Sequence, residues 1–153
     1  MNITEHFTLE EAQHSDTAKK LDIDNRIPDE LLSNLHRMCE KLEEVRALVG
    51  QPIMISSFYR CPALNEKVGG SKTSAHMECR AVDFNAKFHT SEMVFDKIRE
   101  SKIQVDQCII EQDKRGNEWV HVAIEKEGSS PRNEFLRGIK GDTSSKFTRI
   151  ARG

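Results

Sequence analysis

Three residues between positions 76 and 121 have the types and the order of a catalytic zinc site. His76 and Asp83 stand seven residues apart in TSAHMECRAVDF, and His121 follows in EWVHVAIE. Catalytic zinc sites take three protein ligands from His, Asp or Glu and leave a fourth position for water or substrate. However, a histidine in an apolar strand is more often a core residue, and an aspartate that closes a strand usually belongs to a turn. Spacing alone therefore leaves these structural roles open.

The three candidates fall on or beside predicted strands. Apolar runs predict strands in PIMISSFYR (52–60) and RAVDFNA (80–86), and a hairpin over 105–125. The hairpin turn is DKRGN, where Gly116 suits a left-handed position. A small sheet can bring the strands that carry Asp83 and His121 side by side.

Helices are predicted around these strands. The clearest begins at Pro28, carries apolar residues at three- and four-residue spacing, and stops at Gly50. Another covers 90–102, with Thr90 or Ser91 as its cap, and short helical turns are predicted within 7–24 and 61–74. Helices and strands without regular βαβ alternation predict an α+β domain, with a small, mostly antiparallel sheet and flanking helices.

Composition excludes several broad classes. A chain of 153 residues with a net charge of -2 fits one domain and gives no global reason to expect nucleic acid or an anionic membrane as partner. No apolar stretch has bilayer-spanning length, and the amino terminus lacks a basic region followed by an apolar run. We therefore expect a monomer that is made in the cytoplasm without a signal peptide. The four cysteines form no CxxC pair, which argues against a zinc ribbon.

The domain is predicted to span 1–127. From Gly128 onward the chain loses its periodicity and carries six Lys or Arg residues against Glu134 and Asp142. A basic, flexible and solvated extension over 128–153 is the expectation, and a weak tether to an anionic polymer is the alternative.

Three motifs resemble those of the zinc D-alanyl-D-alanine carboxypeptidase and dipeptidase family, which includes phage endolysin L-alanyl-D-glutamate peptidases. SAHMECRAVD resembles the family signature SxHxxGxAxD, and EWVH resembles its second element, ExWH, although here Trp directly follows Glu. SSFYRCPALNEKVGGSKTSAH is similar to a run in phage and bacterial members, as is the leader HFTLEE. The resemblance covers roughly residues 5 to 125.

The resemblance implies that His76, Asp83 and His121 bind Zn²⁺. It also implies that Ser74 lines the site and that Arg60 faces the substrate or the developing oxyanion. A guanidinium can hold a carboxylate in a fork or stabilise negative charge as a tetrahedral intermediate forms.

Two glutamates compete for the role of general base. Glu118 stands three residues before His121 and matches the dipeptidase motif, so the motif favours it. Glu111, in IIEQ, resembles a glutamate of phage-type members. Residues three apart on a regular strand face opposite sides, so Glu118 needs a bulge to reach the site. If Ile109 lies opposite His121, Glu111 shares the face of that ligand, and a one-residue shift of register reverses this.

The resemblance implies a zinc metallopeptidase that cuts stem peptides of bacterial peptidoglycan, either at D-Ala-D-Ala or at L-Ala-D-Glu. Such a carboxypeptidase or endopeptidase would act on the cell wall after release in phage lysis, or as part of a virion. The alternative is a non-catalytic zinc-containing module that binds the wall or serves in the virion. One departure is Cys79, which occupies the family's glycine position and must reach the same backbone geometry at some cost.

Overall fold

A computed structural model describes residues 1–139 and 147–153 of the chain. The helical elements are α1 (Leu9–Gln13), α2 (Asp16–Lys20), the 3-10 turn η1 (Asp29–Leu31), α3 (Leu32–Val49), α4 (Pro62–Lys67), the 3-10 turn η2 (Ala75–Glu78) and α5 (Ser91–Glu100). The strands are β1 (Ile53–Ser57), β2 (Ala81–Ala86), β3 (Gln107–Gln112), β4 (Glu118–Ala123), β5 (Glu134–Ile139) and β6 (Thr148–Ile150). This combination confirms the predicted α+β class.

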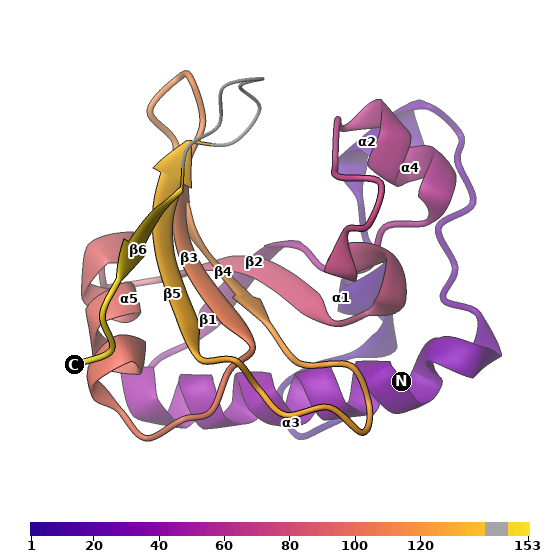
Figure 1. Cartoon of the computed structure of the whole chain (residues 1–153). Coiled ribbons are helices and arrows are strands. Elements are labelled where there is room, and N and C mark those ends of the chain that lie inside the picture. Colours follow the sequence, from indigo (N-terminus) through magenta and orange to yellow (C-terminus); the bar gives the residue numbers. More distant parts are fainter. Residues whose placement is uncertain (140–146) are drawn as a thin grey trace.

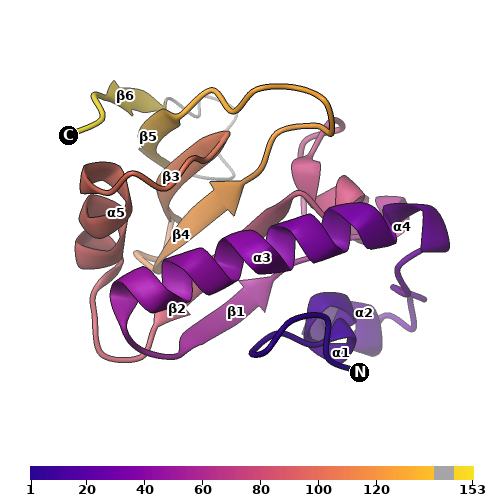
Figure 2. The ribbon, with the colours of Figure 1, turned by 90° about the horizontal axis from the view of Figure 1, so that it is seen from below.

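The strands of the described residues form one sheet, in the order β1-β2-β4-β3-β5-β6. All neighbouring pairs are antiparallel except β3 and β5, so the prediction of a mostly antiparallel sheet is confirmed. The long helix α3 crosses one face of the sheet, with α5 near one end of it, as Figure 2 shows. The short helices α1, α2 and α4 form a separate group, to the right in Figure 1.

The long helix ends where the sequence predicts, but its α-helical part begins at Leu32, four residues after the predicted start at Pro28. A 3-10 turn follows Pro28 and leads into α3, and Gly50 ends the helix in the left-handed conformation at φ +73°. The apolar stripe of α3 is buried in the core. Among the described residues, no helix is both long and apolar enough to cross a membrane.

The hairpin of β3 and β4 sets which side chains share a face of the sheet. Ile109 lies opposite His121, and Glu111 lies opposite Trp119, in a continuous register. In the turn, Gly116 has the expected positive φ of +88°. Glu111, Trp119 and His121 therefore project from the same face.

The first strand is shorter than predicted. The ladder between β1 and β2 ends at the pairing of Ser57 with Asp83, after an irregularity between Ile55 and Ser57. The predicted strand 52–60 is therefore strand only over β1, and the segment 58–61 lies outside the sheet. Backbone groups of this segment need partners other than a neighbouring strand.

The structure differs from the expectation of a flexible extension over 128–153. β5 pairs in parallel with β3, so the sheet continues past residue 127. Phe135 is 1 % exposed, and its ring meets that of Phe95 edge-on at 6.0 Å. The apolar pattern was weak here because Phe135 is the single buried residue of β5. Lys140 and Lys146 lie outside the described residues.

Three cations of this segment also contact the rest of the domain. Arg132 forms a two-pronged ion pair with Asp106, and Arg137 pairs with Glu92. Arg152 donates to the carbonyls of Ser101 and Ile103. These side chains therefore hold the carboxy-terminal segment on the domain.

Phe135→Ala tests whether this segment belongs to the core. We expect the free energy of unfolding to fall by about 3–5 kcal/mol, because the change leaves a cavity beneath the sheet. Chemical denaturation followed by circular dichroism measures the difference. A loss within about 0.5 kcal/mol, typical of a surface position, would contradict the placement of β5.

Candidate metal centre

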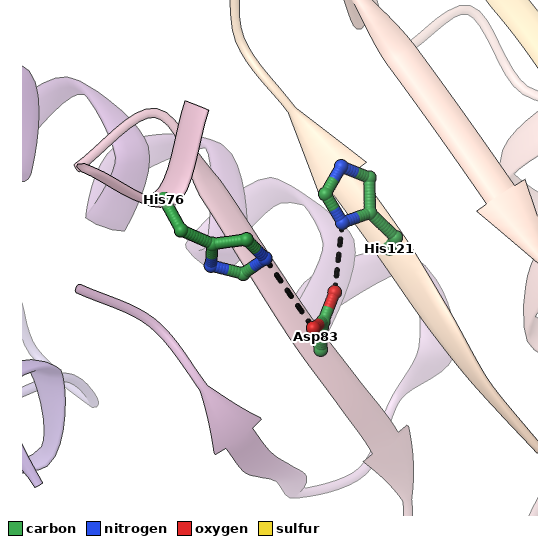
Figure 3. Close-up of side chains that lie close together, drawn as sticks. All are labelled: His76, Asp83 and His121. Atoms are coloured by element: carbon green, nitrogen blue, oxygen red, sulfur yellow. Dashed lines mark hydrogen bonds and ion pairs between the residues drawn. The ribbon is translucent and has the colours of Figure 1, made fainter. Parts of the chain in front are cut away.

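Neighbouring strands and one short turn bring the three predicted ligands together. Asp83 on β2 lies directly opposite His121 on β4. His76 lies in η2, which precedes β2 and returns over this face of the sheet (Figure 3). One ligating atom from each residue lies within 4.8 Å of the others. The fold thus places the three side chains around one point.

The carboxylate of Asp83 lies between the two imidazoles. Its Oδ1 accepts a hydrogen bond of 2.7 Å from His121 Nδ1, and its Oδ2 lies 3.3 Å from His76 Nε2 (Figure 3). The two imidazole rings meet edge-on, with centroids 5.3 Å apart. Asp83 is 4 % exposed and His76 is 1 % exposed, so this contact is almost dry.

A backbone carbonyl fixes the orientation of His76. Nδ1 donates to the carbonyl oxygen of Phe58 at 2.6 Å, so the lone pair is on Nε2, which points toward Asp83. Among the described residues, Nε2 has no hydrogen bond of good geometry, although Asp83 lies at ion-pair distance. A hydrogen bond from the other ring nitrogen is the usual support of a metal-binding histidine.

The protonation states also suit a metal ligand set. Burial lowers the pKa of His76 and outweighs the opposing effect of Asp83, which favours the neutral imidazole that a metal needs. Burial would raise the pKa of Asp83, but the imidazoles of His76 and His121 hold it well below its usual range. Two imidazoles and one carboxylate fit the type of zinc site that has three protein ligands and one open position.

Glu111, and not Glu118, lies beside this group. Glu111 Oε1 is 3.4 Å from His121 Nδ1, and the residue is 4 % exposed. Because side chains alternate along regular β4, Glu118 projects from the opposite face to His121. On that face, Arg137 donates a hydrogen bond to Glu92, which raises the pKa of Arg137. The negative charge of Glu118 raises the pKa of Arg137 further. The motif-based preference for Glu118 as base does not fit this register.

Arg60 brings a buried cation to the same place. It is 6 % exposed, and its NH2 group lies 3.5 Å from the hydroxyl of Ser74. That hydroxyl also accepts from the backbone N–H of His76 at 3.3 Å. Burial lowers the pKa of Arg60, and the charges of Asp83 and Glu111 oppose this. Since arginine stays protonated at physiological pH, a positive charge faces two carboxylates here.

A cleft of about 700 Å³ opens over this face of the sheet. Residues of the loop 69–75 and residues within 125–132 contribute to its lining. Gly70 shapes the loop 69–75, because an added Cβ would lie 2.0 Å from Oδ1 of Asn65. Asn65 in turn donates to the carbonyl of Ser71 at 2.8 Å. The cleft reaches two of the candidate ligands, His76 and His121, and also Glu111.

The other histidines set aside from the sequence have different partners. These pairs are His6 with Glu43, His14 with Asp16, His36 with Glu40, and His89 with Gln51. In the part of the chain that the structure describes, His76, Asp83 and His121 form the cluster of metal-binding geometry.

The sequence of the chain also matches a known protein family. Residues 5–123 match the family described as Peptidase M15. The chain belongs to the peptidase M15 family. Its members are zinc-dependent metallopeptidases of the D-Ala-D-Ala carboxypeptidase type, so the family resemblance seen in the sequence is confirmed. No curated protein gives a match.

The departure of this M15 peptidase from the family pattern, Cys79, has a clear backbone consequence. Cys79 ends η2 with φ 59° and ψ 27°, a left-handed conformation that costs a non-glycine residue roughly 1–2 kcal/mol. Burial raises the pKa of its thiol to about 12, with Cys39 adding to the effect, which disfavours a thiolate ligand. The side chain belongs instead to the core.

Sequence reasoning missed the supporting groups of the M15 site. The carbonyl of Phe58 orients His76, but every residue has a carbonyl, so no residue type signals this role. Asn65 was unremarkable within a short helix, although the Gly69-Gly70 pair after it indicated an unusual backbone. Contacts between these groups depend on the packed fold rather than on local pattern.

Loss of one ligand should abolish tight zinc binding. We expect the wild-type chain to bind one zinc ion and His76→Ala to weaken binding by more than about 100-fold, beyond the effect of losing a supporting hydrogen bond. Chelator competition measures the affinity, and exposed His36→Ala serves as the matched control. Wild-type affinity in His76→Ala would contradict the ligand assignment.

Two substitutions at Cys79 separate backbone strain from packing. Cys79→Ala keeps the left-handed cost, whereas Cys79→Gly removes it and loses about 0.8 kcal/mol for one further buried carbon. We therefore expect the glycine variant to be at least as stable as the alanine variant in chemical denaturation. At an ordinary φ the alanine variant would instead be more stable, by roughly 0.5–1 kcal/mol.

Proposed function

We propose that this M15 metallopeptidase hydrolyses a peptide bond in the stem peptides of bacterial peptidoglycan, at D-Ala-D-Ala or at L-Ala-D-Glu. The observation that carries the proposal is the burial of Glu111 and Arg60 beside the His76–Asp83–His121 group, at the base of an open cleft. A module that only binds has no need of a buried carboxylate and a buried cation at this point.

The residues present fit a zinc ion, and the proposed hydrolysis requires no other cofactor. His76 Nε2, the carboxylate of Asp83 and the imidazole of His121 would hold the ion. When bound, zinc supplies Lewis-acid chemistry, polarising a carbonyl and making water more acidic.

Glu111 is proposed as the general base. Its carboxylate, 3.4 Å from His121 Nδ1, lies within the lining of the cleft and close to the ligand set. From there it would take a proton from the attacking water and deliver it to the amine that leaves. General acid–base catalysis of this kind contributes about 10²–10⁴-fold to a rate.

Arg60 is proposed to stabilise negative charge on the substrate. Its guanidinium lines the cleft next to Ser74, where it can hold a substrate carboxylate or the oxyanion that develops at the carbonyl. Ser74 supports this position through its hydroxyl.

The cleft chemistry suits a charged peptide. Both signs of charge line it beyond the metal centre: Arg80, Asp106, Glu125, Lys126 and Arg132. Stem peptides carry free carboxylates and amines, so such a lining offers them partners. The resemblance of the motifs to phage members supports action on the cell wall after release in lysis, or as part of a virion.

Glu111→Gln and Glu118→Gln form a matched test of this function. Wild-type protein loaded with zinc should cleave purified muropeptides, and mass spectrometry of the products should identify the bond. We expect Glu111→Gln to lower kcat by about 10²–10⁴-fold while it keeps zinc, because the proton acceptor is lost. Glu118→Gln should keep wild-type kcat.

The opposite ranking of the two variants would overturn the assignment of the base. If zinc-loaded wild-type protein binds muropeptides and releases no product, the non-catalytic module is the correct function. Release of terminal D-Ala indicates a carboxypeptidase, and separation of L-Ala from D-Glu indicates an endopeptidase.

A further inference from the structure

We propose that Asn25 is a positioning residue for Arg60 and His76, so that the amino-terminal leader forms part of the active site's support. The proposal rests on the function proposed above for Arg60. Asn25 is 6 % exposed and lies between α2 and η1, far along the chain from both residues. Its side chain contacts the segment 58–61, which lies outside the sheet.

The amide of Asn25 holds the peptide units on both sides of Arg60. Nδ2 donates to the carbonyl of Tyr59 at 3.0 Å, and Oδ1 accepts from the backbone N–H of Cys61 at 2.8 Å. Nδ2 also donates to the carbonyl of Gln13 at 3.0 Å. Two carbonyls and one N–H around the amide fix which end is nitrogen, and only a side chain with both donor and acceptor satisfies all three.

The segment 58–61 depends on these bonds because it has no strand partner. The ladder of β1 stops at Ser57, so the next backbone groups must find other partners. The leader supplies them on one side, through Asn25 and through the carbonyl of Ala12, which accepts from Tyr59 N at 3.0 Å. On the other side, Arg60 N donates to the carbonyl of His76 at 3.2 Å.

Contacts of the Arg60 side chain alone hold it weakly. Its hydrogen bond to Ser74 is long, at 3.5 Å, and within the described residues its buried Nε has no hydrogen-bond partner. The position of the guanidinium therefore depends largely on the position of the Arg60 backbone. The same segment carries the Phe58 carbonyl that orients His76, so one clamp serves both residues.

A double-mutant cycle tests whether Asn25 acts through Arg60. At saturating zinc we expect Asn25→Ala to lower kcat/KM for muropeptides by about 100-fold, the effect of a small misplacement of a catalytic group. In an Arg60→Lys background the same change should cause little further loss, since coupled residues are not additive. Equal losses in both backgrounds, or wild-type kcat/KM in Asn25→Ala, would overturn the proposal.

Two further variants separate positioning from loss of stability. Val45→Ala, in the buried stripe of α3, should reduce stability while leaving kcat/KM unchanged. Asn25→Asp keeps the shape but turns an oxygen toward the carbonyls of Gln13 and Tyr59, so it should lose activity as Asn25→Ala does. An active Asn25→Asp would contradict the clamp.

Zinc affinity provides a readout that needs no substrate. Asn25→Ala should raise the zinc Kd by about 10-fold, because the support of His76 is loosened, whereas Val45→Ala should not. If the wild-type protein cleaves no muropeptide, the proposed function fails by itself and this comparison still decides the role of Asn25. An unchanged Kd in Asn25→Ala would then overturn it.

Discussion

The pairing of Asp83 with His121 across β2 and β4 is the constraint on which the site depends. In an antiparallel pair, residues directly opposite one another project from the same face. This register places an acceptor carboxylate against one imidazole and leaves its second oxygen for His76. The matching register of β3 adds Glu111 to that face. A slip of one residue in either pair would move these groups to the core face.

The burial of these ionisable groups costs free energy unless the groups have partners. Ionisable groups taken out of water must find partners, and here the carboxylate of Asp83 lies between two imidazoles while the charges of Asp83 and Glu111 favour the buried cation of Arg60. Their support comes from outside the sheet: from the carbonyl of Phe58, from the hydroxyl of Ser74, and from the leader that holds segment 58–61. The sheet thus supplies the floor, and the irregular segments hold the residues above it.

Much of the fold followed from local pattern, whereas the choice of base and the carboxy-terminal strand did not. Apolar spacing and Gly50 located α3, and the motifs located the three candidate ligands. The choice between Glu111 and Glu118 depends on hairpin register, which the turn sequence alone leaves open by one residue. β5 was missed because Phe135 is its single buried residue and stands outside any periodic apolar run.

X-ray absorption at the zinc edge of the zinc-loaded full-length protein tests the central claim most directly. The account predicts only nitrogen and oxygen scatterers, at about 2.0–2.2 Å, with an outer-shell signal from two imidazoles. All four cysteines, Cys79 included, should be absent from the first shell. A sulfur scatterer at about 2.3 Å, or the signal of a single imidazole, would contradict an open site built from His76, Asp83 and His121.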